Sequence, residues 1–336
     1  MPFDDYEGEL TGTAIGSLVL MSMNGVGSVT VNALMSRFKT LGDIRTAELS
    51  QLTQIMRRVP PSLRNAQAWN EAVSKAENEL NQANVHGVQI LGTNDLDYPV
   101  LLRNVRDRPP VLYVKGTLQP GEKNVACVGT VHPSNSGIAE TQRIVSFLAN
   151  NGWSIVSGLA LGIDTESHRQ ALRSKGHTVA VLAGGLDSIF PKENQKLAEE
   201  ILEHGSALIS EQPFGVIARA GSLIQRDRIQ CGMSTCTIAM QTGIRGGTMH
   251  TVGFTVAQQR KLLVPVPQGL DREHAKCEGI IALLEKTGSE LAQVVEQKTA
   301  DYLQILRSEF RNKPVATGID ANDTYEQIIA KIGWKD

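Results

Sequence analysis

Glycine-rich turns carry the residue types and the spacing in this chain that are most suited to chemistry. Each turn follows a short apolar run and opens an amphipathic segment, so backbone N–H groups and a helix N-terminus would face the same anion. Three of these turns can be located in the sequence. The first contains Gly129 and Thr130, the second contains Ser157, Gly158 and Gly162, and the third contains Gly184 and Gly185. Glycine also permits tight packing of a helix against a strand, which is the competing explanation. Three such turns at one sheet edge favour a phosphate-binding pocket.

Basic residues near these turns could supply the positive charge that a phosphate needs. Between residues 219 and 261 the chain has six Lys or Arg residues and one acidic residue, Asp227. A solvated helix face would explain the same run. Arg226 and Arg228 are two residues apart and cannot share one helix face, so one of them is expected to be structural. The remaining candidate phosphate contacts are His132, Lys192, Arg226, Arg228, Arg245, Gly246, Gly247 and Thr248.

A buried parallel sheet is the element that must position these turns. The apolar runs 125–128, 154–156 and 178–183 each lead into a glycine turn and then a helical pattern, as in consecutive βαβ units. Ligands of such sheets bind outside the carboxyl ends of the strands. Further strands are predicted at 88–91, 111–115, 207–209, 237–240 and 262–266, the last of the chain. The predicted fold class is therefore α/β, with a doubly wound, mostly parallel sheet.

A separate helical domain is predicted before the sheet. Residues 10–82 have helical patterns, and Gly25-Val26-Gly27 lies between two of them, as in a helix-hairpin-helix element that binds a phosphate. A plain pair of helices with a tight turn explains this slightly better, because no Lys or Arg lies between Leu10 and Ser36. The predicted domains are 1–82 (helical), 83–296 (α/β) and 297–336 (a short C-terminal tail).

Composition excludes several classes of protein. The 336 residues are 41% hydrophobic and 20% charged, which is typical of a soluble globular protein. The net charge is −2, so a nucleic-acid site must be local. The four cysteines lack the paired spacing of metal ligands and are expected to be buried, reduced thiols. No apolar run is long enough for a membrane span or a signal segment, so we expect a cytoplasmic protein. We also expect neither a metal nor a cofactor.

Several short motifs in a fixed order indicate a family resemblance. They are Pro109-Pro110-Val111-Leu112-Tyr113-Val114-Lys115-Gly116, Ser157-Gly158-Leu159-Ala160-Leu161-Gly162-Ile163-Asp164 with His168, Phe190-Pro191 with Asn194, Ser210-Glu211-Gln212-Pro213 and Arg226-Asp227-Arg228-Ile229. Together they resemble the DprA/Smf family (DNA-processing protein A), over roughly residues 90–268. Gly246-Gly247-Thr248 also resembles the nucleotide-binding turn of the wider SLOG superfamily, to which that family belongs.

The resemblance implies a Rossmann-like domain after a small helical domain of SAM or helix-hairpin-helix type. It further implies a cytoplasmic homodimer that binds and protects single-stranded DNA and helps to load a RecA-type recombinase in natural transformation, without catalysis. The stretches 262–266 and 280–284 could supply a dimer interface, although burial in the core is the stronger explanation for 262–266. The chain departs from the family at Val131 and Leu161, where arginine is usual. Two missing cations predict weaker phosphate contacts and indicate a divergent paralogue.

A nucleotide-binding sensor or nucleotide-processing protein of a defence or stress system is the alternative. Val131 and Leu161 favour it, because a small nucleotide needs fewer cationic contacts than a strand does. Hydrolases of the wider superfamily carry a glutamate just after the Gly-Gly-Thr turn, but residues 249–255 contain none, so no hydrolysis is expected. Asp164 is expected to cap its helix and to form a structural pair with His168, and Glu211 to orient an arginine or a ribose hydroxyl. We predict a DNA-binding protein rather than an enzyme.

Overall fold

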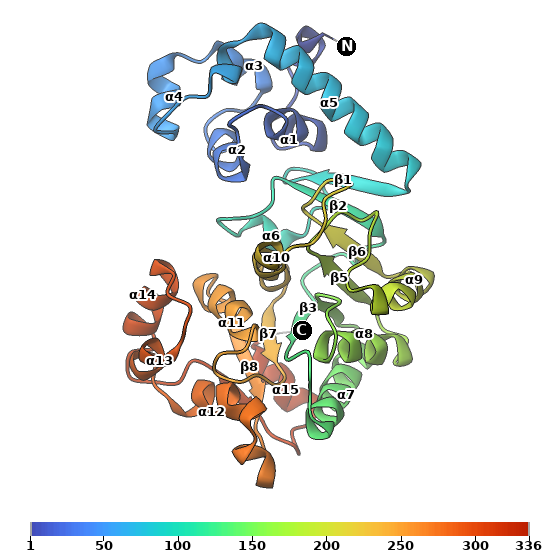
Figure 1. Cartoon of the computed structure of the whole chain (residues 1–336), viewed down its shortest axis with the longest axis vertical. Coiled ribbons are helices and arrows are strands. Elements are labelled where there is room, and N and C mark those ends of the chain that lie inside the picture. Colours follow the sequence, from blue (N-terminus) through green and yellow to red (C-terminus); the bar gives the residue numbers. More distant parts are fainter. Residues whose placement is uncertain (1, 335–336) are drawn as a thin grey trace.

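The computed structural model describes residues 2–334, and its elements form a small helical part followed by a larger α/β part (Figure 1). The helical part contains α1 (Ala14–Met21), α2 (Ser28–Met35), α3 (Leu41–Thr46), α4 (Leu49–Ile55) and α5 (Ala66–Val85), with short 3-10 helices at Phe3–Tyr6 and Pro61–Arg64. Its core includes Leu20, Leu34, Leu52 and Trp69, which are fully buried. Helix α5 begins where the Asn65 side chain accepts the N–H groups of Gln67 and Ala68.

A tight turn joins α1 to α2 at the predicted glycine hairpin. Gly25 has φ +83°, a left-handed conformation that glycine adopts without steric cost. Gly27 is the N-cap of α2. Helix α2 also contacts the α/β part, because Asn32 Nδ2 donates to the carbonyl of Arg108 over 2.8 Å. The hairpin therefore helps to join the two parts of the molecule.

One sheet runs through the α/β part. Its strands are β1 (Val88–Gly92), β2 (Val111–Gly116), β3 (Asn124–Val128), β4 (Ser154–Ser157), β5 (Thr178–Leu182), β6 (Ala207–Ser210), β7 (Cys236–Ala239), β8 (Lys261–Pro265) and β9 (Thr317–Ile319). Within residues 2–334 these nine strands have the order β1-β2-β6-β5-β4-β3-β7-β8-β9. The pairs β1–β2 and β2–β6 are antiparallel, and the other pairs are parallel. After β6 the chain crosses to the far side of β3, so the topological switch point lies between β3 and β7.

Helices cover both faces of this sheet (Figure 1). One face carries α7 (Asn135–Asn150), α8 (Ile163–Arg173), α9 (Gln195–Glu203) and α15 (Tyr325–Ile332). The other carries α6 (Val100–Arg103), α10 (Ala220–Gly232), α11 (Thr248–Ala257), α12 (Glu278–Glu285), α13 (Gly288–Val294) and α14 (Ala300–Ser308). Short 3-10 helices occupy Lys192–Asn194, Gly269–Glu273 and Ala275–Cys277. The predicted fold class, a doubly wound and mostly parallel α/β sheet after a small all-α part, is confirmed.

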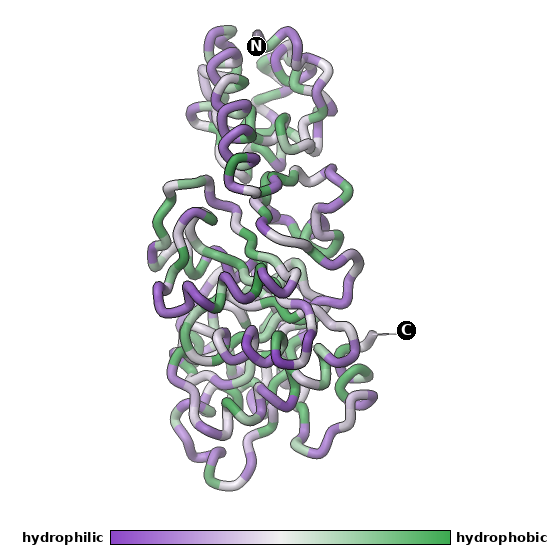
Figure 2. The backbone as a smooth tube through the Cα atoms, turned by 90° about the vertical axis from the view of Figure 1, so that its right-hand side faces the viewer, coloured by the Kyte–Doolittle hydropathy of each residue, from purple (hydrophilic) through white to green (hydrophobic). Residues whose placement is uncertain are grey.

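Hydropathy follows this layered arrangement. Figure 2 shows hydrophilic and hydrophobic residues alternating along the helices, as expected where one face of each helix packs on a core. Buried residues of α7 and α15 share one hydrophobic cluster, and those of α11, α12, α13 and α14 share another on the opposite face. None of the helices within residues 2–334 is both long and apolar enough to cross a membrane.

The C-terminal residues extend the sheet, so the prediction that 262–266 is the last strand is wrong. Strand β9 lies parallel to β8, with Gly318 opposite Val264. Helix α14 adds Tyr302 and Leu306 to the core cluster of α11 and α12, and α15 packs over β8 and β9. Because β9 has only three residues, one of them glycine, it lacks the apolar run that marks the other strands. The predicted boundary at 82/83 falls within α5, which ends at Val85.

Candidate nucleic-acid interface

The carboxyl ends of β3 and β7 are held together by one buried glutamine. The Thr130 N–H donates to the Gln241 carbonyl over 2.8 Å, and the Ser134 N–H donates to Gln241 Oε1 over 2.9 Å. Gln241 is only 2% exposed. The turn of Gly129 and Thr130 is thereby fixed beside the loop that leads from β7 to α11. Sequence reasoning missed Gln241, because a single glutamine after a strand has no pattern of its own.

The second turn, after β4, already binds a carboxylate of the protein. Asp164 Oδ2 accepts the N–H groups of Gly158 over 3.1 Å and of Ala160 over 3.4 Å. Gly162, with φ +78°, is the N-cap of α8. The prediction that Asp164 caps this helix is therefore wrong, since its side chain reaches back across the turn instead. The Ser157 hydroxyl donates to the Cys127 carbonyl over 2.7 Å, inside the sheet.

Arg226 ties this second turn to the end of β5. Its Nη1 donates to the carbonyls of Gly158 and Val181, and its Nε donates to Asp227 over 3.1 Å. A Cβ at Gly158 would overlap the guanidinium, which explains why glycine stands there. Burial raises the pKa of Asp164 to about 6, although the positive charge of Arg226 opposes that rise. Burial also raises the pKa of Asp227.

Arg228, two residues further along α10 and on another side of the helix, also has its guanidinium group held by the protein. Its guanidinium makes a bidentate pair with Glu211, at 2.7 and 2.6 Å, and its Nε donates to the Asp107 carbonyl over 3.1 Å. The side chains of Arg226 and Arg228 are 6% and 8% exposed. The prediction that Glu211 orients an arginine is confirmed. The structural role expected for one of the two arginines applies to both, because protein oxygens surround each guanidinium group.

The third turn, after β5, is locked to the loop after β6. The Gly185 N–H donates to the Val216 carbonyl over 2.8 Å, and the Gly215 N–H donates to Asp187 Oδ1 over 3.0 Å. A Cβ at Gly184 would lie 2.7 Å from the Val216 carbonyl oxygen, so close loop packing requires glycine there. Both glycines are buried. At this turn the observed contacts match the packing explanation.

The fourth turn, before α11, is more open. Gly247 is exposed, and no heavy atom lies within 4 Å of where its Cβ would stand. Arg245 has 81% of its side chain exposed and lies 3.4 Å from Glu296. The Thr248 side chain is buried, and the Gly246 N–H donates to the Gly243 carbonyl. Of the four turns, this one best retains the arrangement expected for an anion at a helix N-terminus.

The side chains that remain exposed along this edge are a mixture of apolar and basic groups. Each loop after β3, β4, β5 and β6 presents one large apolar residue; these are Val131 (48% exposed), Leu161 (37%), Phe190 (51%) and Ile217 (74%). His132, Lys192, Arg219 and Arg245 are exposed beside them. Sequence reasoning counted Val131 and Leu161 as losses of charge and overlooked the row that they form with Phe190 and Ile217.

Contacts between neighbouring loops keep this row together. A Cβ at Gly162 would overlap the backbone of Val131, which places the loop of Leu161 directly against that of Val131. Asn194 Nδ2 donates to the Leu159 carbonyl over 2.8 Å, which joins the loop after β4 to the segment that follows Phe190. Ile217 passes over Gly184, with its carbonyl carbon 3.5 Å from the position of a Cβ there.

The titratable groups near the edge are arranged for structure. His168 is fully buried, its Nδ1 lies 2.7 Å from Thr178 Oγ1, and burial lowers its pKa to about 3. The predicted structural role of His168 is confirmed, with Thr178 rather than Asp164 as its partner. The four cysteines are buried and free, as predicted. Among the residues that the structure describes, no group of His, Cys, Asp and Glu could hold a metal ion.

Comparisons with known proteins agree with this architecture. A family model described as DNA recombination-mediator protein A matches residues 89–303. Protein Smf of Synechocystis is 39% identical over 171 residues, which are 49% of this chain and 43% of that relative. The chain spans about half the length of the curated relatives that it matches.

Two solved structures are also similar. DNA processing protein A (DprA) from Streptococcus pneumoniae aligns with a TM-score of 0.65 at 24% identity, over 89% of this chain and 98% of that one, which shows a common fold. DNA processing protein A from Helicobacter pylori, whose structure concerns its single-stranded DNA binding mode, aligns with a TM-score of 0.52 at 26% identity. That alignment covers 67% of this chain and 97% of the other.

Proposed function

The chain belongs to the DNA recombination-mediator protein A family, and we propose that it binds single-stranded DNA along the carboxyl edge of its sheet. The family match confirms the resemblance to the DprA/Smf family that the motifs indicate. The DNA processing protein A of Helicobacter pylori, described by its single-stranded DNA binding mode, supports the same ligand for this chain.

The observation that carries the proposal is the pairing of apolar and basic side chains at the edge. Three loops place an exposed apolar residue within two positions of an exposed basic one; the pairs are Val131 and His132, Phe190 and Lys192, and Ile217 and Arg219. A single strand has matching chemistry, since its unstacked bases pack on apolar and aromatic side chains and its phosphates attract cations. A duplex hides its base faces within the stack. We therefore expect the edge to prefer single strands.

Phosphate contacts are assigned to the exposed residues rather than to α10. Lys192, Arg219 and Arg245 have exposed side chains, and Gly247 lies in open space at the start of α11. Arg226 and Arg228 keep their predicted place at the site, but as residues that hold the loops in position. Few free cations imply a weak dependence of affinity on salt.

The experiment is a titration of the purified chain with a fluorescent 20-mer of deoxythymidine and with a duplex of the same length. We expect tighter binding of the single strand, and free deoxynucleotides should compete only weakly. Equal affinity for both forms would contradict the proposal. Displacement of the strand by a free nucleotide at stoichiometric concentration would favour the alternative function, a nucleotide sensor of a defence or stress system.

The wider role of the protein follows from this binding. We propose a cytoplasmic protein that protects incoming single strands during natural transformation and helps to load a RecA-type recombinase. We also propose that it is a binding protein and not an enzyme. A strand-exchange assay with a recombinase and a single-strand-binding protein tests loading, and the absence of any stimulation would contradict it.

We also propose that the protein forms a homodimer. The dimer interface cannot consist of the whole of the predicted stretches 262–266 and 280–284, because most of their residues are buried. Leu262, Leu263, Val264, Ile280 and Leu283 are buried in the core. On the same face, Ile281 and Leu284 are half-buried, and Leu270 and Val294 are exposed at 87% and 43%. Light scattering at tens of micromolar protein should show a dimer that Leu270→Glu weakens, whereas a monomer at every concentration would exclude it.

A further inference from the structure

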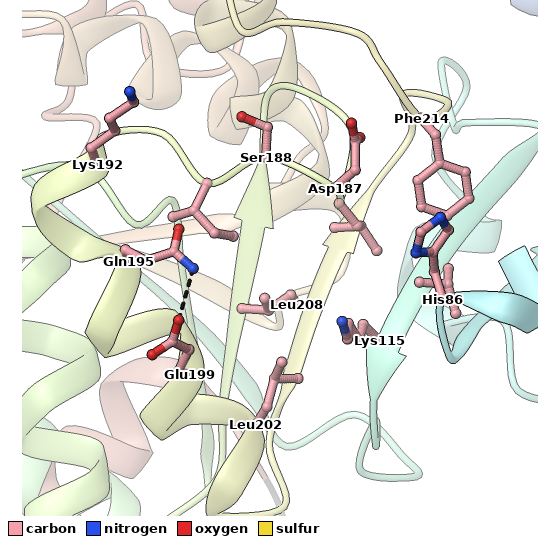
Figure 3. A pocket seen from close by; sticks show the side chains of 13 residues that line it. His86, Lys115, Asp187, Ser188, Lys192, Gln195, Glu199, Leu202, Leu208 and Phe214 are labelled. Carbon is pink, nitrogen blue, oxygen red and sulfur yellow. Dashed lines mark hydrogen bonds between the residues drawn. The ribbon is translucent and has the colours of Figure 1, made fainter.

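A cavity lies on the face of the sheet that carries α9, beside the C-terminal end of α5 (Figure 3). Its volume is about 690 Å³, within the range of small-molecule sites. The floor is apolar and includes Leu186, Leu202 and Leu208. The walls come from the end of α5, strand β2, helix α9 and the loops after β5 and β6.

One wall of this cavity is aromatic. The rings of His86 and Phe214 lie with their centroids 5.1 Å apart and their planes at 42°, and Figure 3 shows them side by side. The Tyr113 ring supports Phe214 from its edge, at 6.0 Å and 75°. Phe214 is half-buried, so one part of its ring is fixed by packing while another part faces the cavity. Such a wall suits a flat aromatic ligand.

Two lysines, Lys115 and Lys192, bring positive charge to the cavity. Lys115 on β2 is half-buried, and its ammonium group makes no hydrogen bond or ion pair with any residue of the described range 2–334. The two carboxylates of the cavity accept hydrogen bonds from uncharged groups, Asp187 from the Gly215 N–H and Glu199 from Gln195 over 2.9 Å, and neither forms an ion pair with Lys115. The charge of Lys115 is therefore available for an anion.

We infer that this cavity binds one nucleotide, with its base against Phe214 and His86 and its phosphate at Lys115. An aromatic wall, an apolar floor and the available ammonium groups of Lys115 and Lys192 together match a planar base that carries a phosphate. The aromatic wall and the floor of this site lie apart from the row at the carboxyl edge, and Lys192 borders both. The loop between β5 and α9 belongs to both, because Leu186 lines the cavity and Phe190 lies in the exposed row.

Two sources could supply such a nucleotide, namely a free nucleotide or one unit of the bound strand. Equilibrium dialysis with radiolabelled deoxyadenosine monophosphate tests the first source, and anisotropy with oligonucleotides of 6 and 20 residues tests the second. The variants are Lys115→Gln and Phe214→Leu, and Lys75→Gln removes the same charge from an exposed position on α5 as the matched control. Circular dichroism spectra identify any variant that does not fold.

We expect Lys115→Gln and Phe214→Leu each to weaken binding of the nucleotide probe about tenfold, because each variant loses one charged or stacking contact. Lys75→Gln should leave the affinity for the same probe unchanged. An effect on the mononucleotide assigns the cavity to a free nucleotide, and an effect on the 20-mer alone assigns it to the strand. Wild-type affinity of both variants for all three probes would overturn the inference. In that case, continued loss of 20-mer binding on Phe190→Ala would leave the proposed function intact.

Discussion

Two groups of basic residues near the same sheet edge have opposite environments. Arg226 and Arg228 on α10 are almost fully buried, and carbonyl and carboxylate oxygens of the protein surround their guanidinium groups. Lys192 and Arg219, on the loops after β5 and β6, have exposed side chains, and neither makes an ion pair among residues 2–334. The α10 arginines determine where the loops lie, and the loop cations are those that can meet a phosphate.

The comparison shows that a run of positive charge along a sequence is not a positive surface. A buried arginine that donates to two loop carbonyls contributes to stability and geometry, and its removal leaves buried acceptors and carboxylates without a partner. An exposed lysine contributes to long-range attraction and to the salt dependence of binding. Substitutions of buried and of exposed basic residues should therefore have different effects, and the largest is expected at Arg226.

Replacing Arg226 with methionine should destabilise the protein strongly. The change leaves Asp164 and Asp227 buried without their shared cation and the carbonyls of Gly158 and Val181 without their donor. We expect a loss of about 3–5 kcal/mol in the free energy of unfolding, measured in urea. Arg245→Met is the matched control, because its side chain is 81% exposed and should cost less than about 0.5 kcal/mol. Similar losses for the two variants would remove the distinction.

Replacing Phe190 with alanine should weaken DNA binding without destabilising the protein. Its ring is 51% exposed, so we expect a loss of about 1–3 kcal/mol in binding free energy for a single strand, the usual contribution of one base stacked on an aromatic ring. Leu96→Ala removes another exposed apolar side chain, 95% exposed, from a loop away from the edge. An anisotropy titration in which the two variants bind alike would exclude Phe190 from the interface.

Restoring the two arginines of the family pattern should increase affinity. Val131 and Leu161 are both exposed at the edge, so Val131→Arg with Leu161→Arg adds two cations that can reach a strand. The slope of log affinity against log salt should steepen by about 1.4, from about 0.7 for each phosphate neutralised on a single strand. A mononucleotide should respond less. An unchanged slope in a folded double variant would show that the strand does not pass these loops.

The stability of the protein should depend on pH through Asp164. The pKa of this carboxyl is raised to about 6 in the folded state, chiefly by burial, so its contribution is present at low pH and is lost as pH rises through 6. Between pH 5 and 7.5 the free energy of unfolding of the wild type should fall by about 1 kcal/mol relative to Asp164→Asn. A constant difference between the two proteins over this range would contradict the assigned pKa.

Local patterns predicted most of the fold, because each parallel strand is an apolar run that ends at a turn with glycine or small polar residues. Strand β9 escaped prediction because Thr317, Gly318 and Ile319 are too few to form such a run. The roles of Arg226 and Arg228 could not be read from spacing, since their partners Gly158, Val181 and Glu211 are distant in sequence. The cavity was equally hidden, because His86, Lys115 and Phe214 meet only after the two parts of the chain pack together.

Photochemical crosslinking tests the central claim, that the carboxyl edge is the DNA-binding face, most directly. A single strand with 5-iodouracil at successive positions would be bound, irradiated and digested, and the crosslinked peptides would be identified by mass spectrometry. We predict crosslinks to peptides that contain Phe190, together with those that contain Val131 or Ile217. Crosslinks confined to the helical part, around the hairpin of Gly25 and Gly27, would contradict the account.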